Sequence, residues 1–164
     1  MPLLENGHVT EDRWAQAIAG EALPAGAVIV PLERLEEGLA RPKDAPLGVA
    51  IGPDVDVAVL RPALPRLGLV AVTFPSFRDG RAFTQARALR EHLSFTGEIR
   101  ATGTPLPDQY EFLLRCGVTT VQTDRAEDVA VWQQAHEIIS IAYQPSVLHE
   151  RPQGLGLRRF LATD

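Results

Sequence analysis

This sequence of 164 residues has a single cysteine, no excess of positive charge and no long apolar run. Its one cysteine, Cys116, excludes an internal disulfide, a CxxC redox pair and an iron–sulfur cluster held by this chain alone. A net charge of −5 argues against nucleic acid or an anionic membrane as the main partner. Because no apolar run approaches the roughly 20 residues that span a bilayer, and no signal peptide is visible, we expect a cytoplasmic protein.

Motifs of the common cofactor sites are also missing from the sequence. It contains no GxGxxG, P-loop, HExxH or GxSxG pattern. Its four histidines are scattered, without the spacing that metal ligands share. We therefore expect no metal site and no cofactor bound by this chain alone.

Short apolar runs alternate with helical patterns along most of the chain. Strands are predicted at 27–31, 47–51, 67–74, 98–102 and 118–122. Helices are predicted at 32–40, at 84–93, from Pro107 to a left-handed cap at Gly117, and in a last segment that carries Trp132. This alternation predicts an α/β protein with parallel βα repeats.

The spacing of the predicted strands, roughly 20 to 30 residues, is that of a TIM barrel, but the chain is too short for eight units. We expect a TIM-barrel-like partial (half) barrel or an open parallel sheet, and a half barrel could pair with another copy of the chain.

Three parts of the chain differ in pattern. An N-terminal segment, 1–26, precedes the βα-repeat domain, 27–140, and a C-terminal tail, 141–164, follows it. In the N-terminal segment, Thr10 could cap a short helix that carries Trp14, and a strand with Trp14 against the core edge is the alternative. The tail has no periodic pattern, and we expect it to be mobile or docked on a partner.

Candidate functional residues follow two of the predicted strands, because parallel sheets bind ligands at the carboxyl ends of their strands. The loop SFRDGR follows 67–74. Its Arg81 suits a bidentate clamp for sulfite, sulfate, phosphate or carboxylate. The alternative is a capped turn with a surface pair between Asp79 and Arg81. Gly80, between them, is expected in a backbone conformation that other residues avoid.

The predicted strand 98–102 carries charge in its interior. Alternation places Glu98, Arg100 and Thr102 on one face, where a central parallel strand is usually apolar. This pattern indicates a structural ion pair, a cleft that faces a ligand, or exposure to solvent. Asp108 and Gln109, in the first turn of the next helix, either suit the helix dipole or belong to the site. The candidate catalytic residues are thus Asp79 and Asp108, and the candidate ligand-binding residues are Arg81, Glu98, Arg100 and Gln109.

Three stretches, FPSFRDGRAFTQARALR, GEIRATG and LPDQYEFLLRCG, resemble the bacterial domain-of-unknown-function family 934. Together they cover most of residues 67–123, and a weaker similarity runs through VIVPL and LGVAI. Members of this family are commonly described as a probable oxidoreductase involved in sulfite reduction. The sequence departs from the expected pattern at Thr84, Thr104 and Val118, and it keeps the acidic, arginine and glutamine residues of the motifs.

The resemblance implies a place in assimilatory sulfur metabolism, beside sulfite reductase and the reductase that makes sulfite from activated sulfate. It supplies no catalytic mechanism, so whether the chain is an enzyme stays open. We expect an accessory or partner protein that binds a sulfite-reducing enzyme, or a small oxyanion, through its charged edge. One alternative is a stand-alone barrel-type enzyme with Asp79 or Asp108 as general base and an arginine that stabilises negative charge. Another is a purely structural interaction protein whose tail makes the contact.

Overall fold

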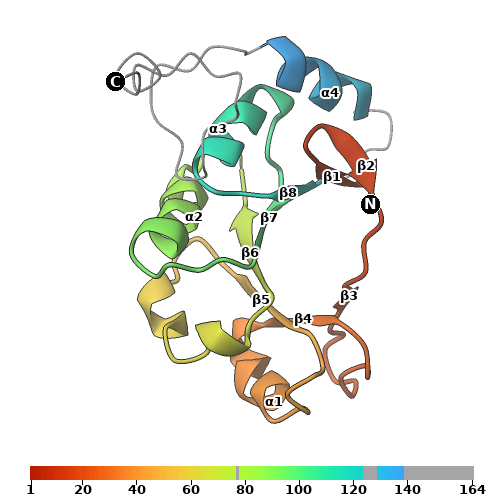
Figure 1. Ribbon diagram of the computed structural model, residues 1–164, viewed down its shortest axis with the longest axis vertical. Helices are drawn as coiled ribbons and strands as arrows, with labels where there is room; N and C mark the ends of the chain where they lie inside the picture. The colour runs from red at the N-terminus through yellow and green to blue at the C-terminus, as the bar shows by residue number, and fades with distance from the viewer. Residues whose placement is uncertain (77, 124–128, 139–164) are drawn as a thin grey trace, which may run out of the picture.

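One curled sheet is the centre of the computed structural model, which describes residues 1–76, 78–123 and 129–138 (Figure 1). In this part of the chain the sheet has eight strands, in the order β2-β1-β8-β7-β6-β5-β4-β3. The parallel strands are β3 (Ala15–Gln16), β4 (Val28–Pro31), β5 (Leu47–Ile51), β6 (Leu69–Phe74), β7 (Glu98–Gly103) and β8 (Thr120–Gln122). The antiparallel strands are β1 (Leu3–Glu5) and β2 (His8–Thr10).

Helices follow most of the parallel strands and lie outside the curve of the sheet. The α-helices are α1 (Leu35–Leu39), α2 (Arg81–Glu91), α3 (Tyr110–Arg115) and α4 (Val129–Ile138). The short 3-10 helices are η1 (Leu32–Arg34), η2 (Val57–Leu60), η3 (Leu64–Arg66) and η4 (Pro107–Gln109). The predicted α/β fold with a half barrel is therefore confirmed, and the five predicted strands correspond to β4–β8 within two residues at each end.

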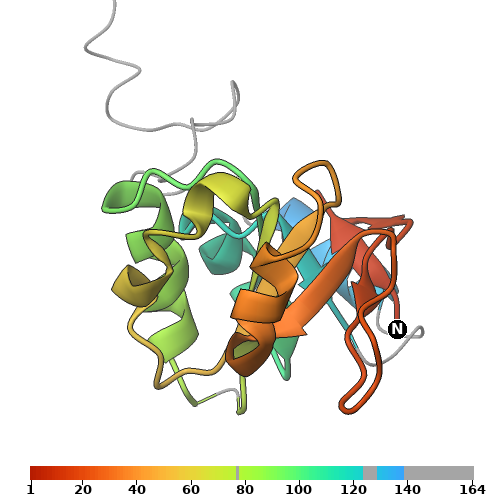
Figure 2. The ribbon, with the colours of Figure 1, turned by 90° about the horizontal axis from the view of Figure 1, so that it is seen from below.

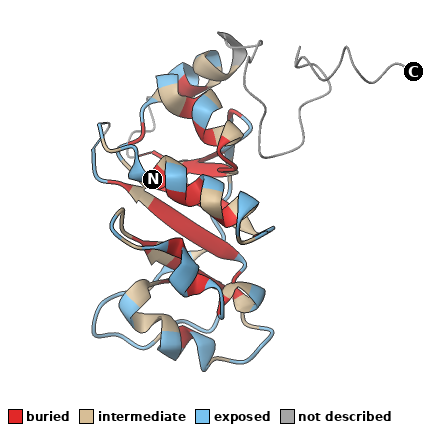
Figure 3. Cartoon of the chain, turned by 90° about the vertical axis from the view of Figure 1, so that its left-hand side faces the viewer, coloured by how far each residue is buried: buried red, intermediate tan, exposed pale blue. Residues whose placement is uncertain are grey.

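The main core lies between the outer face of the sheet and the helices. Val30, Val49, Val72 and Ile99 come from successive strands and are fully buried there. In Figure 3 the helices stand in front of strands whose surface is red, the colour of buried residues. Trp132 of α4 joins this core, as its place in a helical stripe predicts.

Two glycines, one at the end of a strand and one after a helix, have positive φ. A third glycine was expected to have positive φ and has a negative value. Gly117 ends the segment after α3 with a φ of 95°, as predicted. Gly103 ends β7 with a φ of 88°, and a Cβ there would lie 2.3 Å from the carbonyl oxygen of Phe74. Gly80 instead has an ordinary φ of −85° as the residue before α2, so the expected special conformation is wrong. The helix begins at Arg81, three residues before the predicted start.

The N-terminal residues form strands rather than the helix that Thr10 could have capped. Strands β1 and β2 make a hairpin whose turn residues, Asn6 and Gly7, have φ values of 49° and 79°. Two positive φ values in an Asn-Gly turn are the signature of a type I′ hairpin. The hairpin extends the sheet beyond β8, so the N-terminal segment and the βα repeats share one sheet.

Only four residues, 11–14, connect the two edge strands of this sheet, and we call them the strap. A flat sheet of eight strands would hold its edges about 34 Å apart, seven spacings of about 4.8 Å. The five steps from Thr10 to Ala15 extend at most about 18 Å. The sheet must therefore curl, and Figure 1 shows the strap on the open side of the curve, opposite the helices. Figure 2 gives the same arrangement from below, with α2 and the N-terminal strands on opposite sides.

The inner face of the curl has an apolar half and a polar half. On β4 and β6, Ile29, Leu69 and Ala71 form a small buried cluster with Trp14 of the strap. On β7, β8 and β1, the residues that continue this face in register are Arg100, Thr120 and Glu5. The polar half of the inner face is where two of the predicted ligand-binding residues lie.

Candidate functional site

The six predicted site residues lie in three separate places. Asp79 and Arg81 lie at the carboxyl ends of the strands, on the loop before α2 and at its first residue. Glu98 and Arg100 lie on the inner face of β7, on the opposite side of the sheet from α2. Asp108 and Gln109 are in η4, after β7. The structure thus keeps three neighbouring pairs together and does not bring all six residues to one charged edge.

Arg81 binds two carboxylates at the rim of the sheet formed by the carboxyl ends of the strands. Its guanidinium donates to Asp79 Oδ1 at 2.9 Å and to Asp79 Oδ2 at 2.6 Å, and it also pairs with Asp54 of the loop after β5. The Asp79 carboxylate accepts a further hydrogen bond from the backbone N–H of Arg81, at 3.2 Å. Arg81 remains 53% exposed. We call Asp54, Asp79 and Arg81 the rim cluster.

The hydrogen bond from the Arg81 guanidinium lowers the pKa of Asp79 from 3.8 to about 2, and the bond from the Arg81 backbone adds to this effect. The same contact raises the pKa of Arg81 above its usual value. Asp79 is therefore a carboxylate at any physiological pH, and its basicity is low. A general base near neutral pH would need the opposite shift.

Arg100 is the most buried charged side chain of the inner face, with no exposed surface. Its Nε donates to Glu98 Oε1 at 2.9 Å, and its Nη1 donates to Asp12 Oδ2 of the strap at 2.8 Å. Thr120 Oγ1 donates to the same Glu98 oxygen at 2.6 Å. We call Asp12, Glu98, Arg100 and Thr120 the inner cluster.

One guanidinium nitrogen of Arg100 is left without a hydrogen bond. Nη2 lies 2.9 Å from Glu98 Oε1, close enough for ion pairing, but its geometry does not satisfy that of a hydrogen bond. Two carboxylates thus balance the positive charge of Arg100 inside the protein. These contacts make Arg100 part of a buried ion pair, one of the three interpretations of strand 98–102.

Asp108 and Gln109 occupy the first turn of the segment after β7. Gln109 is half-buried, and its side-chain oxygen accepts a hydrogen bond from the backbone N–H of Leu106 at 3.1 Å. Asp108 is exposed, beside Pro107 at the start of η4. Gln109 therefore helps to begin the helix.

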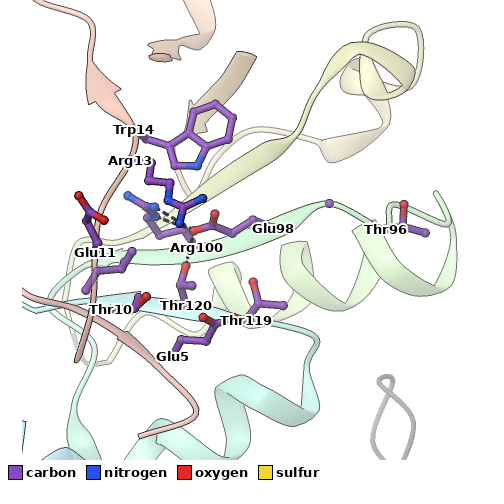
Figure 4. A pocket seen from close by; sticks show the side chains of 12 residues that line it. Glu5, Thr10, Glu11, Arg13, Trp14, Thr96, Glu98, Arg100, Thr119 and Thr120 are labelled. Carbon is purple, nitrogen blue, oxygen red and sulfur yellow. Dashed lines mark hydrogen bonds and ion pairs between the residues drawn. The ribbon is translucent and has the colours of Figure 1, made fainter. Parts of the chain in front are cut away.

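A pocket of about 480 Å³ lies next to the inner cluster, at the amino ends of β7 and β8 (Figure 4). Strap residues and the inner face supply its walls, which comprise Leu3, Glu5, Thr10, Glu11, Arg13, Trp14, Thr96, Gly97, Glu98, Arg100, Thr119 and Thr120. Of the predicted site residues, Glu98 and Arg100 line it. Candidate sites were predicted at the carboxyl ends of the strands, and this pocket is at the other end.

Arg90 of α2 supports the loop that forms one wall of the pocket. Its guanidinium donates to the carbonyl oxygens of Phe95 at 2.5 Å, of Gly97 at 2.8 Å and of Gly117 at 2.9 Å. Burial lowers the pKa of Arg90 from its usual value. The helical pattern around Arg90 contains no signal for these carbonyl contacts.

Several groups that complete the two clusters were not visible in the sequence. Asp12 is 88 residues from Arg100 along the chain, and Asp54 is 27 residues from Arg81. Only the Asn-Gly turn could have indicated that the N-terminal segment joins the sheet. Cys116 is buried, and burial raises the pKa of its thiol, as expected of a structural cysteine.

Comparison with known families gives one match. The model of the family "Bacterial protein of unknown function (DUF934)" matches residues 48–154, about two-thirds of the chain. No curated protein matches the sequence. Within the described residues, no helix has the length and apolar character to cross a membrane, and no three His, Cys, Asp or Glu side chains gather as a metal site would require.

Proposed function

The chain belongs to the bacterial family DUF934, and from this premise we propose that it is an accessory protein of sulfite reduction that acts by contact with a sulfite-reducing enzyme. The link to sulfite reduction rests on the resemblance of the SFRDGR, GEIRATG and LPDQ motifs to that family. The choice of an accessory role rests on the ion pairs that the charged residues of those motifs form.

The pairing of the two motif arginines is the observation that carries this proposal. Arg81 and Arg100 each contact two carboxylates, so each cluster has a net charge of −1 and no open anion clamp. Asp79, with a pKa of about 2, is a poor general base. A motif whose charges are paired with one another suits a folded docking surface better than a catalytic centre.

An aromatic surface beside the rim cluster supports a protein contact. The rings of Phe74, Phe83 and Phe112 follow one another with centroid distances of 4.9 and 4.7 Å. Phe74 is fully buried, whereas Phe112 is 48% exposed. Phe83 and Arg81 both belong to the first turn of α2. Exposed aromatic side chains are typical of the energetic centre of an interface.

The stand-alone enzyme receives less support from the same residues. Neither Asp79 nor Asp108 lines the pocket described above, so neither candidate base faces it. The third possibility, a contact made by residues 141–164, lies outside the described residues.

The proposal is tested by co-purification from the bacterial host under sulfate-limited growth, with bound proteins identified by mass spectrometry. The parent is compared with Phe112→Ser and Arg81→Ala. Leu39→Ser, which changes a 36% exposed leucine on α1, is the matched control. Arg100→Ala is unsuitable here because it would remove a buried ion pair.

We expect the parent and Leu39→Ser to recover sulfite reductase or the activated-sulfate reductase, and both Phe112→Ser and Arg81→Ala to lose it. The complex is then rebuilt from the purified partners, so that binding is measured directly. Recovery that neither Phe112→Ser nor Arg81→Ala changes would move the contact away from this surface. Absence of both enzymes from every sample would contradict the accessory role.

A further inference from the structure

The pocket beside the strap has charges of both signs at opposite ends. Figure 4 places Arg13 and Trp14 on one side of the Arg100–Glu98 pair and Glu5 on the other side. Arg13 and Glu5 are exposed, and the side chain of neither forms a hydrogen bond or ion pair with another described residue. Both side chains are therefore available to a ligand.

Arg100 is not available in the same way. It has no exposed surface, and Asp12 and Glu98 neutralise its charge from within the protein. The charges that a ligand would meet are the guanidinium of Arg13 and the carboxylates of Glu5, Glu11 and Glu98. A simple oxyanion would gain one guanidinium and face three carboxylates. A simple amine would gain the carboxylates but face Arg13.

We propose that this pocket binds an α-amino acid, with basic amino acids preferred. The ligand carboxylate pairs with Arg13, its α-ammonium group pairs with Glu98, and a basic side chain extends toward Glu5 at the other end of the pocket. The volume, about 480 Å³, is within the usual range for small-molecule sites, and Trp14 and Leu3 supply apolar wall. The preference for a basic side chain follows from the excess of carboxylates, since Glu5 and Glu11 remain to pair with a second positive group.

Both walls of the pocket are held in place before a ligand arrives. Asp12 accepts hydrogen bonds from Arg100 and from the backbone N–H of Trp14, which ties the strap to the inner face. Arg90 holds the loop at Gly97 on the opposite wall. A preorganised pocket avoids the entropic cost of ordering its walls on binding. This inference is independent of the proposed contact with a sulfite-reducing enzyme.

The test is a titration of the full chain, followed by the indole N–H signals of its two tryptophans in NMR spectra. Trp14 lines the pocket, whereas Trp132 is buried in the main core, so the two signals report different regions. The probes are the twenty standard L-amino acids and sodium sulfate. Two analogues of lysine accompany them: cadaverine, which lacks the carboxylate, and 6-aminohexanoate, which lacks the α-ammonium group.

Two variants remove one charged contact each, Arg13→Gln and Glu5→Gln. Arg61→Gln and Glu36→Gln, at exposed positions away from the pocket lining, are the matched controls. We expect L-lysine or L-arginine to shift the Trp14 signal with a Kd below about 1 mM. Each pocket variant should weaken that binding about tenfold, and the controls should not change it.

Three results would overturn the proposal. The first is that no amino acid shifts the Trp14 signal in the parent chain. The second is that cadaverine, 6-aminohexanoate or sulfate binds as tightly as the best amino acid. The third is that Arg13→Gln and Glu5→Gln leave the affinity unchanged. A protein that binds amino acids but not a sulfite-reducing enzyme would refute the proposed function and leave this inference intact.

Discussion

The inner cluster and the rim cluster contain the same groups, one arginine between two carboxylates, in different surroundings. Arg100 is fully buried at distances of 2.8 and 2.9 Å from Asp12 and Glu98. Arg81 is 53% exposed and makes equally short contacts. The difference teaches that distance alone does not decide what an ion pair contributes.

The access of water to the charged groups decides how much each ion pair contributes to stability. Around Arg81, water can replace either carboxylate, so removing one partner costs little. Water does not reach the side chain of Arg100, and the carboxylates of Asp12 and Glu98 are only 26% and 23% exposed, so a carboxylate that loses this partner stays largely buried without compensation. The inner cluster should therefore control the stability of the fold, and the rim cluster should be free to change without unfolding it.

Arg100→Met should have the largest effect. It leaves Asp12 and Glu98 facing each other without a cation, which should lower the free energy of unfolding by about 3–5 kcal/mol. Urea unfolding of parent and variant measures this loss, and Arg61→Met, at an exposed position, is the control. A loss under about 1 kcal/mol would mean that the ion pairs of Arg100 contribute no more to stability than exposed ion pairs do.

Asp12→Asn should have an intermediate effect, about 2 kcal/mol, because it weakens one charge-assisted hydrogen bond to Arg100 and keeps the side chain's shape. The strap should also open more often, and Arg13 within it is a trypsin site. We expect faster tryptic cleavage after Arg13 under native conditions, with Glu11→Gln as the control. Equal cleavage rates would show that Asp12 does not hold the strap.

Asp79→Asn should have the smallest effect, and that effect should depend on pH. Because the folded pKa of Asp79 is lowered to about 2, its contribution to stability is complete above its usual value of 3.8 and is lost as pH falls through about 2. Thermal unfolding should show a modest difference from the parent at pH 6 that shrinks between pH 3.8 and pH 2. A difference that stays constant over this range would contradict the assigned cause.

Much of the fold could be predicted because its signals are local. The apolar runs that became β4–β8 and the helical stripe around Leu89 are properties of short windows. The alternation of Glu98 and Arg100 likewise showed that one face of β7 is charged. What these windows lack is the partner: the strap that brings Asp12 to Arg100 comes from the other end of the chain.

The location of the pocket was unpredictable for the same reason. Parallel sheets usually bind ligands at the carboxyl ends of their strands, and that rule placed the candidates after β6 and β7. The rule takes no account of a sheet whose two edges are joined by four residues. That connection carries Arg13 and Trp14 to the amino ends of β7 and β8, where the pocket forms.

The most direct test of the central claim, that the charged motif residues form two independent clusters, is a pair of double-mutant cycles. One combines Arg100→Met with Asp12→Asn, and the other combines Arg100→Met with Asp79→Asn. We predict a coupling of about 1 kcal/mol or more in the first cycle and additive effects in the second. Additivity in the first cycle, or strong coupling in the second, would contradict the division of these residues into an inner cluster and a rim cluster.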